Sequence, residues 1–176
     1  MEIKSPFNLF NWIEENRHLL KPPVGNKNLY VDSGDYIVMI VGGPNARKDY
    51  HYNETEELFF QLEGDILVKT QQNGKCVDVP IKAGEMFLLP AKIPHSPIRS
   101  KDSIGLVIER KRKPHHKDGL MWFSEKENAL LYEEYFHLTN IEKDFLPVFK
   151  KFYNSEKLRT CPVSGEVMEV DPRFKN

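Results

Sequence analysis

The apolar residues follow a helical period at the N-terminus and a strand-like pattern beyond it. Phe7, Phe10 and Ile13 fall on one helical stripe, so we expect a helix over Pro6–Leu20. The prolines and the glycine in residues 21–26 would end this helix and begin an extended segment. Its apolar stripe predicts packing against the outside of a sheet or against another subunit.

The central region consists of short β-prone runs separated by turns that contain glycine or proline. The clearest turn is Gln72–Asn73–Gly74–Lys75, which is typical of a β-hairpin. No helix-length pattern interrupts the runs, which argues against a parallel α/β sheet and favours an antiparallel sandwich or small barrel. The run at residues 104–109 is the last clear strand that the pattern predicts. The expected strands are residues 36–41, 58–65, 66–70, 76–81, 86–89 and 104–109.

The C-terminal third is less regular. Arg110–Lys117 is a basic run without interleaved aromatic residues, which favours a solvated loop over a nucleic-acid patch. His115 and His116 are adjacent, so in an extended loop they should point apart and are not counted as metal ligands. Glu125–Tyr135 fits either a strand or a helix, whereas Thr139–Phe152 has a helical pattern. The apolar face of that helix would consist of Ile141, Phe145, Phe149 and Phe152.

Length and composition limit the class of protein. We predict one domain over residues 1–176, with a barrel core at about 29–112 and a helical tail at about 139–176. The 25 basic and 26 acidic residues give a net charge of −1, which predicts no general affinity for nucleic acid or anionic membranes. No apolar run approaches the roughly 20 residues of a membrane helix, and no secretory pattern opens the chain. Cys76 and Cys161 predict two free thiols in a reducing cytosol, with a long-range disulfide as the alternative.

Three residues stand out as candidate metal ligands. His51 and Glu57 lie in one segment and His95 in another, so a folded sheet would have to bring them together. Two imidazoles and one carboxylate suit a divalent iron site that keeps coordination positions open. Zinc or manganese would fit the same ligand types. Taken singly, each residue is more often a surface or hydrogen-bonded side chain.

Charged residues near these three predict a binding site for an anion. Arg47 precedes His51 by four residues, and Arg99 follows His95 by four, so in strands each would share a face with its ligand. A guanidinium group suits a carboxylate, which it grips through two parallel hydrogen bonds. Glu109 ends an apolar strand and could also face inward. As alternatives, Arg47 and Glu109 could pair with each other or with Asp49, and Arg99 could lie on the surface.

Two segments resemble the paired motifs of the cupin superfamily. Residues 51–64 read His-x-Asn-x3-Glu-x6-Gly, and residues 84–95 read Gly-x5-Pro-x-Lys-x2-His. Asn53 stands where that superfamily usually has a second histidine, and Lys92 where it has a glycine. The resemblance implies an all-β cupin (jelly-roll) barrel with a few flanking helices at the N- and C-terminal ends. With the departure at Asn53, it implies three protein ligands, which are His51, Glu57 and His95.

From about Pro6 to Gly165 the chain also resembles the 3-hydroxyanthranilate 3,4-dioxygenase family. The resemblance implies that His51, Glu57 and His95 bind iron. It also implies substrate contacts for Arg47, Arg99, Glu109, Asn26 and the ligand Glu57, with Glu109 and Arg47 as catalytic residues. The strings that carry it are Lys21–Asn26, Val41–Asn45, Asp49–His51, Glu56–Glu57, Phe87–Pro90, His95–Pro97 and Val107–Arg110.

The same resemblance implies a reaction. One Fe(II) per chain would open the ring of 3-hydroxyanthranilate with O2 to give 2-amino-3-carboxymuconate semialdehyde, which closes to quinolinate, a precursor of NAD. Arg99, assisted by Arg47, would hold the carboxylate, and Glu109 would bond the amine or take a proton. The resemblance further implies a homodimer. The alternatives are a non-catalytic metal-binding cupin that senses or stores a small aromatic acid, and a dioxygenase of another aminophenol or thiol.

The C-terminal region departs from this family. Bacterial members often bind a second iron through two Cys-x-x-Cys pairs, and the corresponding residues here are Ser124, Glu127, Cys161 and Ser164. One thiolate cannot make a tetrahedral sulfur site. We therefore predict that this chain has no second metal site.

Overall fold

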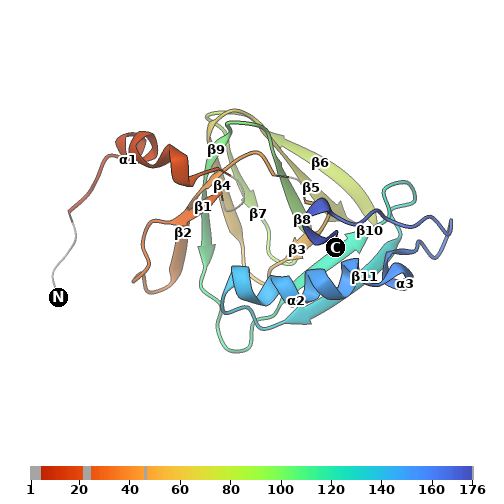
Figure 1. Cartoon of the computed structure of the whole chain (residues 1–176). Helices are drawn as coiled ribbons and strands as arrows, with labels where there is room; N and C mark the ends of the chain where they lie inside the picture. The colour runs from red at the N-terminus through yellow and green to blue at the C-terminus, as the bar shows by residue number, and fades with distance from the viewer. Residues whose placement is uncertain (1–4, 22–24, 46, 176) are drawn as a thin grey trace.

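Two antiparallel β-sheets face each other and enclose the core (Figure 1). The computed structural model describes residues 5–21, 25–45 and 47–175. One sheet has the strand order β1-β2-β9-β4-β7, and the other has β11-β10-β3-β8-β5-β6. Helices flank this pair of sheets near both ends of the chain, which confirms the predicted all-β class. The strands are β1 Asn26–Asn28, β2 Tyr36–Gly42, β3 Tyr50–Tyr52, β4 Glu57–Glu63, β5 Ile66–Gln72, β6 Lys75–Ile81, β7 Met86–Leu89, β8 His95–Arg99, β9 Ile104–Arg110, β10 Asp118–Phe123 and β11 Leu130–Phe136.

The sheets extend further along the chain than the sequence pattern predicted. Strand β9 is not the last, because β10 and β11 follow it as an antiparallel pair. Every residue of β10 but Phe123 is buried, and it pairs with β3 on its other side, so it is a central strand. Three basic residues at 110–112 and two glutamates within β11 hide this hairpin in the sequence. The predicted barrel core of 29–112 is therefore too short, while the single-domain organisation stays a prediction.

The N-terminal helix is shorter than predicted and lies outside the sheet. Helix α1 spans Leu9–Asn16, and a 3-10 turn follows at Arg17–Leu19. It begins after Asn8 because the side chain of Asn8 accepts a hydrogen bond of 3.0 Å from the backbone N–H of Asn11. Ile13 packs with Ile40 on the outer side of the sheet, as expected. The predicted break falls partly on residues 22–24, which lie outside the described part of the chain.

Strand alternation turns polar as well as apolar side chains into the interior between the sheets. In β4, Glu57, Phe59 and Gln61 are buried and face the other sheet, and the residues between them face outward. In β9, Glu109 lies directly opposite Glu57. The interior between the sheets also contains an apolar cluster of Met39, Ile66, Val68, Ile81, Leu89 and Val107.

Helix α2 (Ile141–Tyr153) covers β10 and β11, as Figure 1 shows. Trp122 stacks on Phe152 with ring centroids 4.2 Å apart, and Phe145 lies edge-on to His51 at 5.4 Å. Phe145, Phe149 and Phe152 therefore form the predicted apolar face, while the side chain of Ile141 lies outside the described part. A short helix α3 (Glu156–Arg159) and a 3-10 turn (Pro172–Phe174) complete the tail.

Two further expectations can be compared with the fold. Cys76 and Cys161 are both free thiols, as predicted. Within the described residues, no helix combines the length and the apolar character that crossing a bilayer requires.

Candidate metal centre

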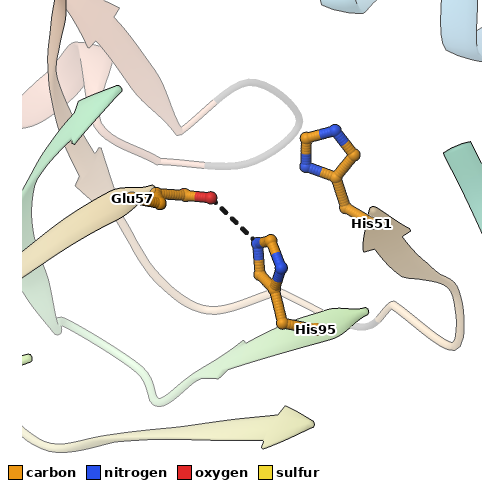
Figure 2. A group of neighbouring side chains, drawn as sticks. All are labelled: His51, Glu57 and His95. Atoms are coloured by element: carbon orange, nitrogen blue, oxygen red, sulfur yellow. Dashed lines mark ion pairs between the residues drawn. The ribbon is translucent and has the colours of Figure 1, made fainter. Parts of the chain in front are cut away.

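His51, Glu57 and His95 converge in the interior (Figure 2) and are called the triad below. One potential ligand atom from each lies within 4.8 Å of the others, and all three residues are buried. His51 on β3 pairs directly with His95 on β8, and Glu57 reaches them from β4 in the facing sheet. The predicted convergence of these distant residues is thus found.

His95 and Glu57 present two acceptor atoms to each other. The Nδ1 of His95 lies 3.0 Å from the carbonyl oxygen of Ile93 and donates to it, which leaves the lone pair on Nε2. That Nε2 lies 2.9 Å from Glu57 Oε2, an oxygen for which the described residues supply no hydrogen bond. Burial is the largest influence and disfavours the charged form of each group. When Nε2 carries a proton, however, the two groups attract each other as an ion pair, so the pKa of His95 is raised and that of Glu57 is lowered. A metal cation would take the place of that proton and bind to both groups.

His51 is held by a carboxylate on its other side. Its Nε2 lies 2.7 Å from Asp118 Oδ2, so the nitrogen left for the triad is Nδ1. Figure 2 shows one ring nitrogen of His51 directed toward Glu57 and His95 and the other directed away. Burial lowers the pKa of His51 despite the opposing effect of Asp118, which favours the neutral imidazole that binds metals.

The chemistry of these donors fits a divalent transition metal. Two neutral imidazole nitrogens and one carboxylate oxygen form a set that Fe(II), Zn(II) and Mn(II) all accept. Asn53 adds no fourth ligand, because its Oδ1 accepts two hydrogen bonds of 3.0 Å from Thr55 and its Nδ2 is a donor. Lys92, which replaces the usual glycine, has a φ of +67°, the left-handed conformation that glycine favours.

Arg99 is a buried cation without a counter-ion. It is 5% exposed, its Nη1 has no hydrogen-bond partner, and it forms no ion pair within the described residues. Burial lowers the pKa of Arg99, the charge of Glu57 opposes this and the charge of Arg47 adds to it, and the net result is a pKa of about 10. The alternative of a surface position for Arg99 is therefore wrong.

Arg47 takes the partner that we had weighed as an alternative. Its Nη2 lies 2.5 Å from Oδ2 of the buried Asp49. Arg47 precedes strand β3 instead of lying in it, so the expectation of a shared strand face with His51 is wrong. Its charge nevertheless lowers the pKa of both His95 and Arg99, which places it beside the triad.

Glu109 is buried and faces the triad. It pairs with Glu57 across the two strands, and it forms an ion pair with Arg112. Burial, followed by the charge of Glu57, raises the pKa of Glu109 to about 7 in spite of Arg112. A carboxyl group that titrates near neutrality can take or give a proton under working conditions.

Asn26 is less directly connected to the triad. It is the first residue of β1 and makes no side-chain hydrogen bond within the described residues. The register places Asn26 opposite Val41 on β2, Val41 opposite Gly105 on β9, and Gly105 opposite Gln61 on β4. These four residues form one row across the sheet. A Cβ atom at Gly105 would lie 3.0 Å from Arg99 Nη1, so the Arg99 guanidinium lies over this row.

Sequence reasoning missed two functional candidates, Arg112 and Asp118. Arg112 stands in the basic run that we expected to be a solvated loop, yet its side chain is only 4% exposed. Its single distinguishing signal is an acidic partner, Asp118, at the start of a buried strand. In the same loop, the rings of His115 and His116 lie edge to face at 4.5 Å, so the expectation that they point apart is wrong.

Ser124, Glu127, Cys161 and Ser164 also lie together and are called the C-terminal cluster. The thiol of Cys161 donates to Glu127 Oε2 at 3.5 Å. Burial raises the pKa of Glu127, but hydrogen bonds from Ser124, Cys161 and Ser164 outweigh it, so the net shift is downward. The absence of a second metal stays a prediction.

Two cavities lie away from the triad. One of about 260 Å³ lies beside the C-terminal cluster and is lined partly by Ser124. The other, of about 490 Å³, is lined partly by Tyr153, and no triad residue lines either cavity.

Known proteins resemble this chain over nearly its whole length. A family profile described as 3-hydroxyanthranilic acid dioxygenase matches residues 1–153. A protein of Xanthomonas campestris pv. campestris (strain 8004) named 3-hydroxyanthranilate 3,4-dioxygenase is 57% identical over 96% of this chain and 95% of its own. Proteins of the same name from Jannaschia sp. and Neurospora crassa are 49% and 42% identical, over 93% and 97% of this chain and 91% and 94% of their own.

Solved structures align with part of this chain at low identity. A cupin-2 domain containing protein from Shewanella frigidimarina aligns with a TM-score of 0.47 and 18% identity, over 56% of this chain and 92% of its own. The sequence relatives are the stronger finding, since they extend across both sheets and the C-terminal helix. Taken with the profile match, they show that this chain belongs to the 3-hydroxyanthranilic acid dioxygenase family.

Proposed function

We propose that this chain is an Fe(II)-dependent dioxygenase that converts 3-hydroxyanthranilate and O2 to 2-amino-3-carboxymuconate semialdehyde. Family membership supports the activity, and the triad supports a metal. The observation that carries the substrate assignment is the buried Arg99 guanidinium, whose Nη1 has no hydrogen-bond partner in the part of the chain that the structure describes. An unpaired buried charge is costly, so this group is expected to meet an anion that enters from outside.

In this proposal His51, Glu57 and His95 hold one Fe(II) per chain. When bound, the iron would supply open coordination positions and the redox chemistry by which O2 attacks the aromatic ring. The contribution of the protein to this step is geometric, because the triad comes from facing sheets and would supply three donor atoms, which leaves coordination positions for reactants. An amine and a hydroxyl on neighbouring ring carbons would suit chelation of such a metal.

Arg99 and Arg47 would fix the orientation of the substrate. The planar Arg99 guanidinium can hold the ring carboxylate through parallel hydrogen bonds, and Arg47 adds positive charge beside it. Arg47 already has Asp49 as a partner, so we assign the main contact to Arg99. Anchoring the carboxylate sets which ring carbons meet the metal.

Glu109 would handle the proton that the substrate releases on binding. Its side chain lies opposite Glu57, and its pKa of about 7 suits a base near neutral pH. Asn26 would line the far side of the same site, on the sheet row above which Arg99 lies. Its carboxamide offers both a donor and an acceptor to the substrate.

The setting of the enzyme is part of the proposal. The product closes without an enzyme to quinolinate, so the chain would act in NAD biosynthesis, by the kynurenine pathway, in the cytoplasm. We further propose a homodimer. The outward face of β4 and β7 supports it, because Leu58 and Phe60 lie beside Met86 and Leu88, which are 64% and 53% exposed.

The test is a ring-opening assay. Protein loaded with Fe(II) without air and then given 3-hydroxyanthranilate and air should show a rising near-ultraviolet absorbance and equivalent O2 uptake. Zn(II)-loaded protein is the matched control and should do neither. A protein that binds 3-hydroxyanthranilate without consuming O2 would instead be a sensor or store of aromatic acids. A panel of other aminophenols and thiols tests the substrate.

A further inference from the structure

Arg112 joins two parts of the site that lie on different sheets. Its Nε lies 3.0 and 3.1 Å from the two carboxylate oxygens of Asp118, and its Nη2 lies 2.7 Å from Oδ2. Its Nη1 donates to Glu109 Oε2 on β9. One guanidinium therefore uses three of its nitrogens on two buried carboxylates, a geometry that lysine cannot reproduce.

Asp118 contacts both Arg112 and the triad residue His51. It is fully buried at the start of β10, and the register of β10 with β3 sets Leu120 opposite His51. Asp118 lies two residues before Leu120 and so shares its face of the sheet. Its Oδ2 accepts from His51 Nε2 at 2.7 Å. The result is a continuous buried chain from His51 through Asp118 and Arg112 to Glu109.

Each member of this chain depends on the next. An imidazole can present either nitrogen to a metal, and a carboxylate on one nitrogen fixes both the tautomer and the ring orientation. A lone buried carboxylate beside a neutral imidazole is costly, and Arg112 neutralises Asp118. The same cation forms an ion pair with Glu109, which lies opposite Glu57 on the neighbouring strand.

We propose that Asp118 and Arg112 are positioning residues, which we call the Asp118–Arg112 bridge. Asp118 holds His51 so that Nδ1 faces the metal, and Arg112 holds Asp118 and Glu109 in fixed relation. The orientation of the metal ligand and the placement of the acid–base group thereby depend on one guanidinium. The metal part of this inference rests on the triad, and the Glu109 part rests on the proposed function.

The first test measures metal binding and does not need turnover. Asp118→Asn keeps the size of the side chain and removes its charge. It should weaken Co(II) affinity by about 10- to 100-fold, measured by competition with a chelator. It should also change the visible absorption of the Co(II) protein, because the His51 ring is no longer fixed. Asp78→Asn, at an exposed aspartate on β6, is the matched control and should change neither quantity.

The second test uses Arg112, which also covers the case in which Asp118→Asn fails to fold. Arg112→Lys keeps the charge but loses the fork, and it should weaken Co(II) binding and alter the spectrum in the same sense. Arg110→Lys, two residues away and exposed, should match the unchanged protein. Folded Arg112→Lys protein with unaltered Co(II) affinity and spectrum, or such a result for Asp118→Asn, overturns the proposal.

The outcomes separate this inference from the proposed function. If unchanged protein fails to open 3-hydroxyanthranilate but Asp118→Asn still weakens Co(II) binding, the reaction is wrong and the bridge stands. If the unchanged protein is active and both variants bind Co(II) normally, the reaction stands and the bridge is wrong.

Discussion

The triad and the C-terminal cluster are two places where distant segments bring polar side chains together, and they differ in how those side chains are satisfied. In the triad, the buried Glu57 Oε2 faces His95 Nε2, and the described residues supply no hydrogen bond to it. In the C-terminal cluster, the exposed Glu127 carboxylate accepts from the Cys161 thiol at 3.5 Å, and desolvation raises its pKa less than Ser124, Cys161 and Ser164 together lower it. The two groups thus share convergence and differ in their donors, and we predict that only the triad binds a metal. Two facing acceptor atoms need a proton or a cation between them, whereas a carboxylate that already accepts from a donor does not.

The sharpest way to break this comparison is to remove the triad. His51→Ala, Glu57→Ala or His95→Ala should each abolish metal binding and turnover, since two ligands cannot hold the ion in a defined geometry. Metal content by elemental analysis and the ring-opening rate measure the two effects. Glu127→Ala, which removes the carboxylate of the other cluster, is the control and should leave both unchanged. If Glu127→Ala lost as much metal and activity as the triad variants, the difference between the two clusters would be wrong.

Removing Arg99 should affect substrate capture more than metal binding. Arg99→Ala deletes a charged hydrogen-bonding group that the protein itself does not satisfy, so we expect KM to rise by about 100-fold with metal content unchanged. Lys101→Ala, at an exposed residue in the turn that follows β8, is the control. If Arg99→Ala bound substrate as well as the unchanged protein, the carboxylate contact would be wrong.

Gly105 offers a smaller change at the same guanidinium. An added Cβ would lie 2.7 Å from Gln61 Oε1 and 3.0 Å from Arg99 Nη1, so the side chains must shift. Gly105→Ala should raise KM by about tenfold and leave the metal in place. Gly34→Ala, where an added Cβ meets nothing within 4 Å, is the matched control. An unchanged KM for Gly105→Ala would show that Arg99 tolerates displacement.

The sequence predicted the triad because spacing and residue type carry that information. His51, Glu57 and His95 lie outside the strands that periodicity predicted, so they were identified by their residue types and by the spacing that resembles the cupin motifs. The strand boundaries of β7 and the helical face of α2 followed from local patterns. These features depend on residues close together in the sequence, where alternation and turn chemistry decide the backbone.

The polar partners could not be predicted in the same way. The burial of Arg112 depends on Asp118 and Glu109, which come together only when β9 and β10 enter different sheets. A basic run is usually solvated, so the local pattern pointed to the wrong environment. The pairing of Arg47 with Asp49 was weighed as an alternative. It occurs because both residues lie in the irregular segment before β3, and the sequence pattern did not predict that this segment is irregular.

Glu109 predicts a pH dependence of stability in the metal-free protein. Its folded pKa of about 7 lies above the ordinary carboxyl value, so the folded state binds the extra proton. The stability from this group is fully present below the unfolded pKa and is lost as the pH rises through about 7. Relative to Glu109→Gln, the free energy of unfolding should therefore fall by about 1–3 kcal/mol between pH 5 and 8, measured with urea in the presence of a chelator. Glu125→Gln, at an exposed side chain, should show no such trend.

The C-terminal cluster predicts the smallest effect. Cys161 donates to the exposed Glu127 carboxylate, and a serine hydroxyl can donate in its place, so Cys161→Ser replaces one donor with another. Metal content should stay at one ion per chain, and the turnover rate should stay within about twofold, because the substitution leaves every triad contact in place. Only the melting temperature should fall, since Cys161 is 2% exposed and packs tightly. Two tightly held irons in the unchanged protein, with one lost in Cys161→Ser, would show that this cluster binds a metal. A carboxylate that already accepts a hydrogen bond could then not be used to predict that a metal is absent.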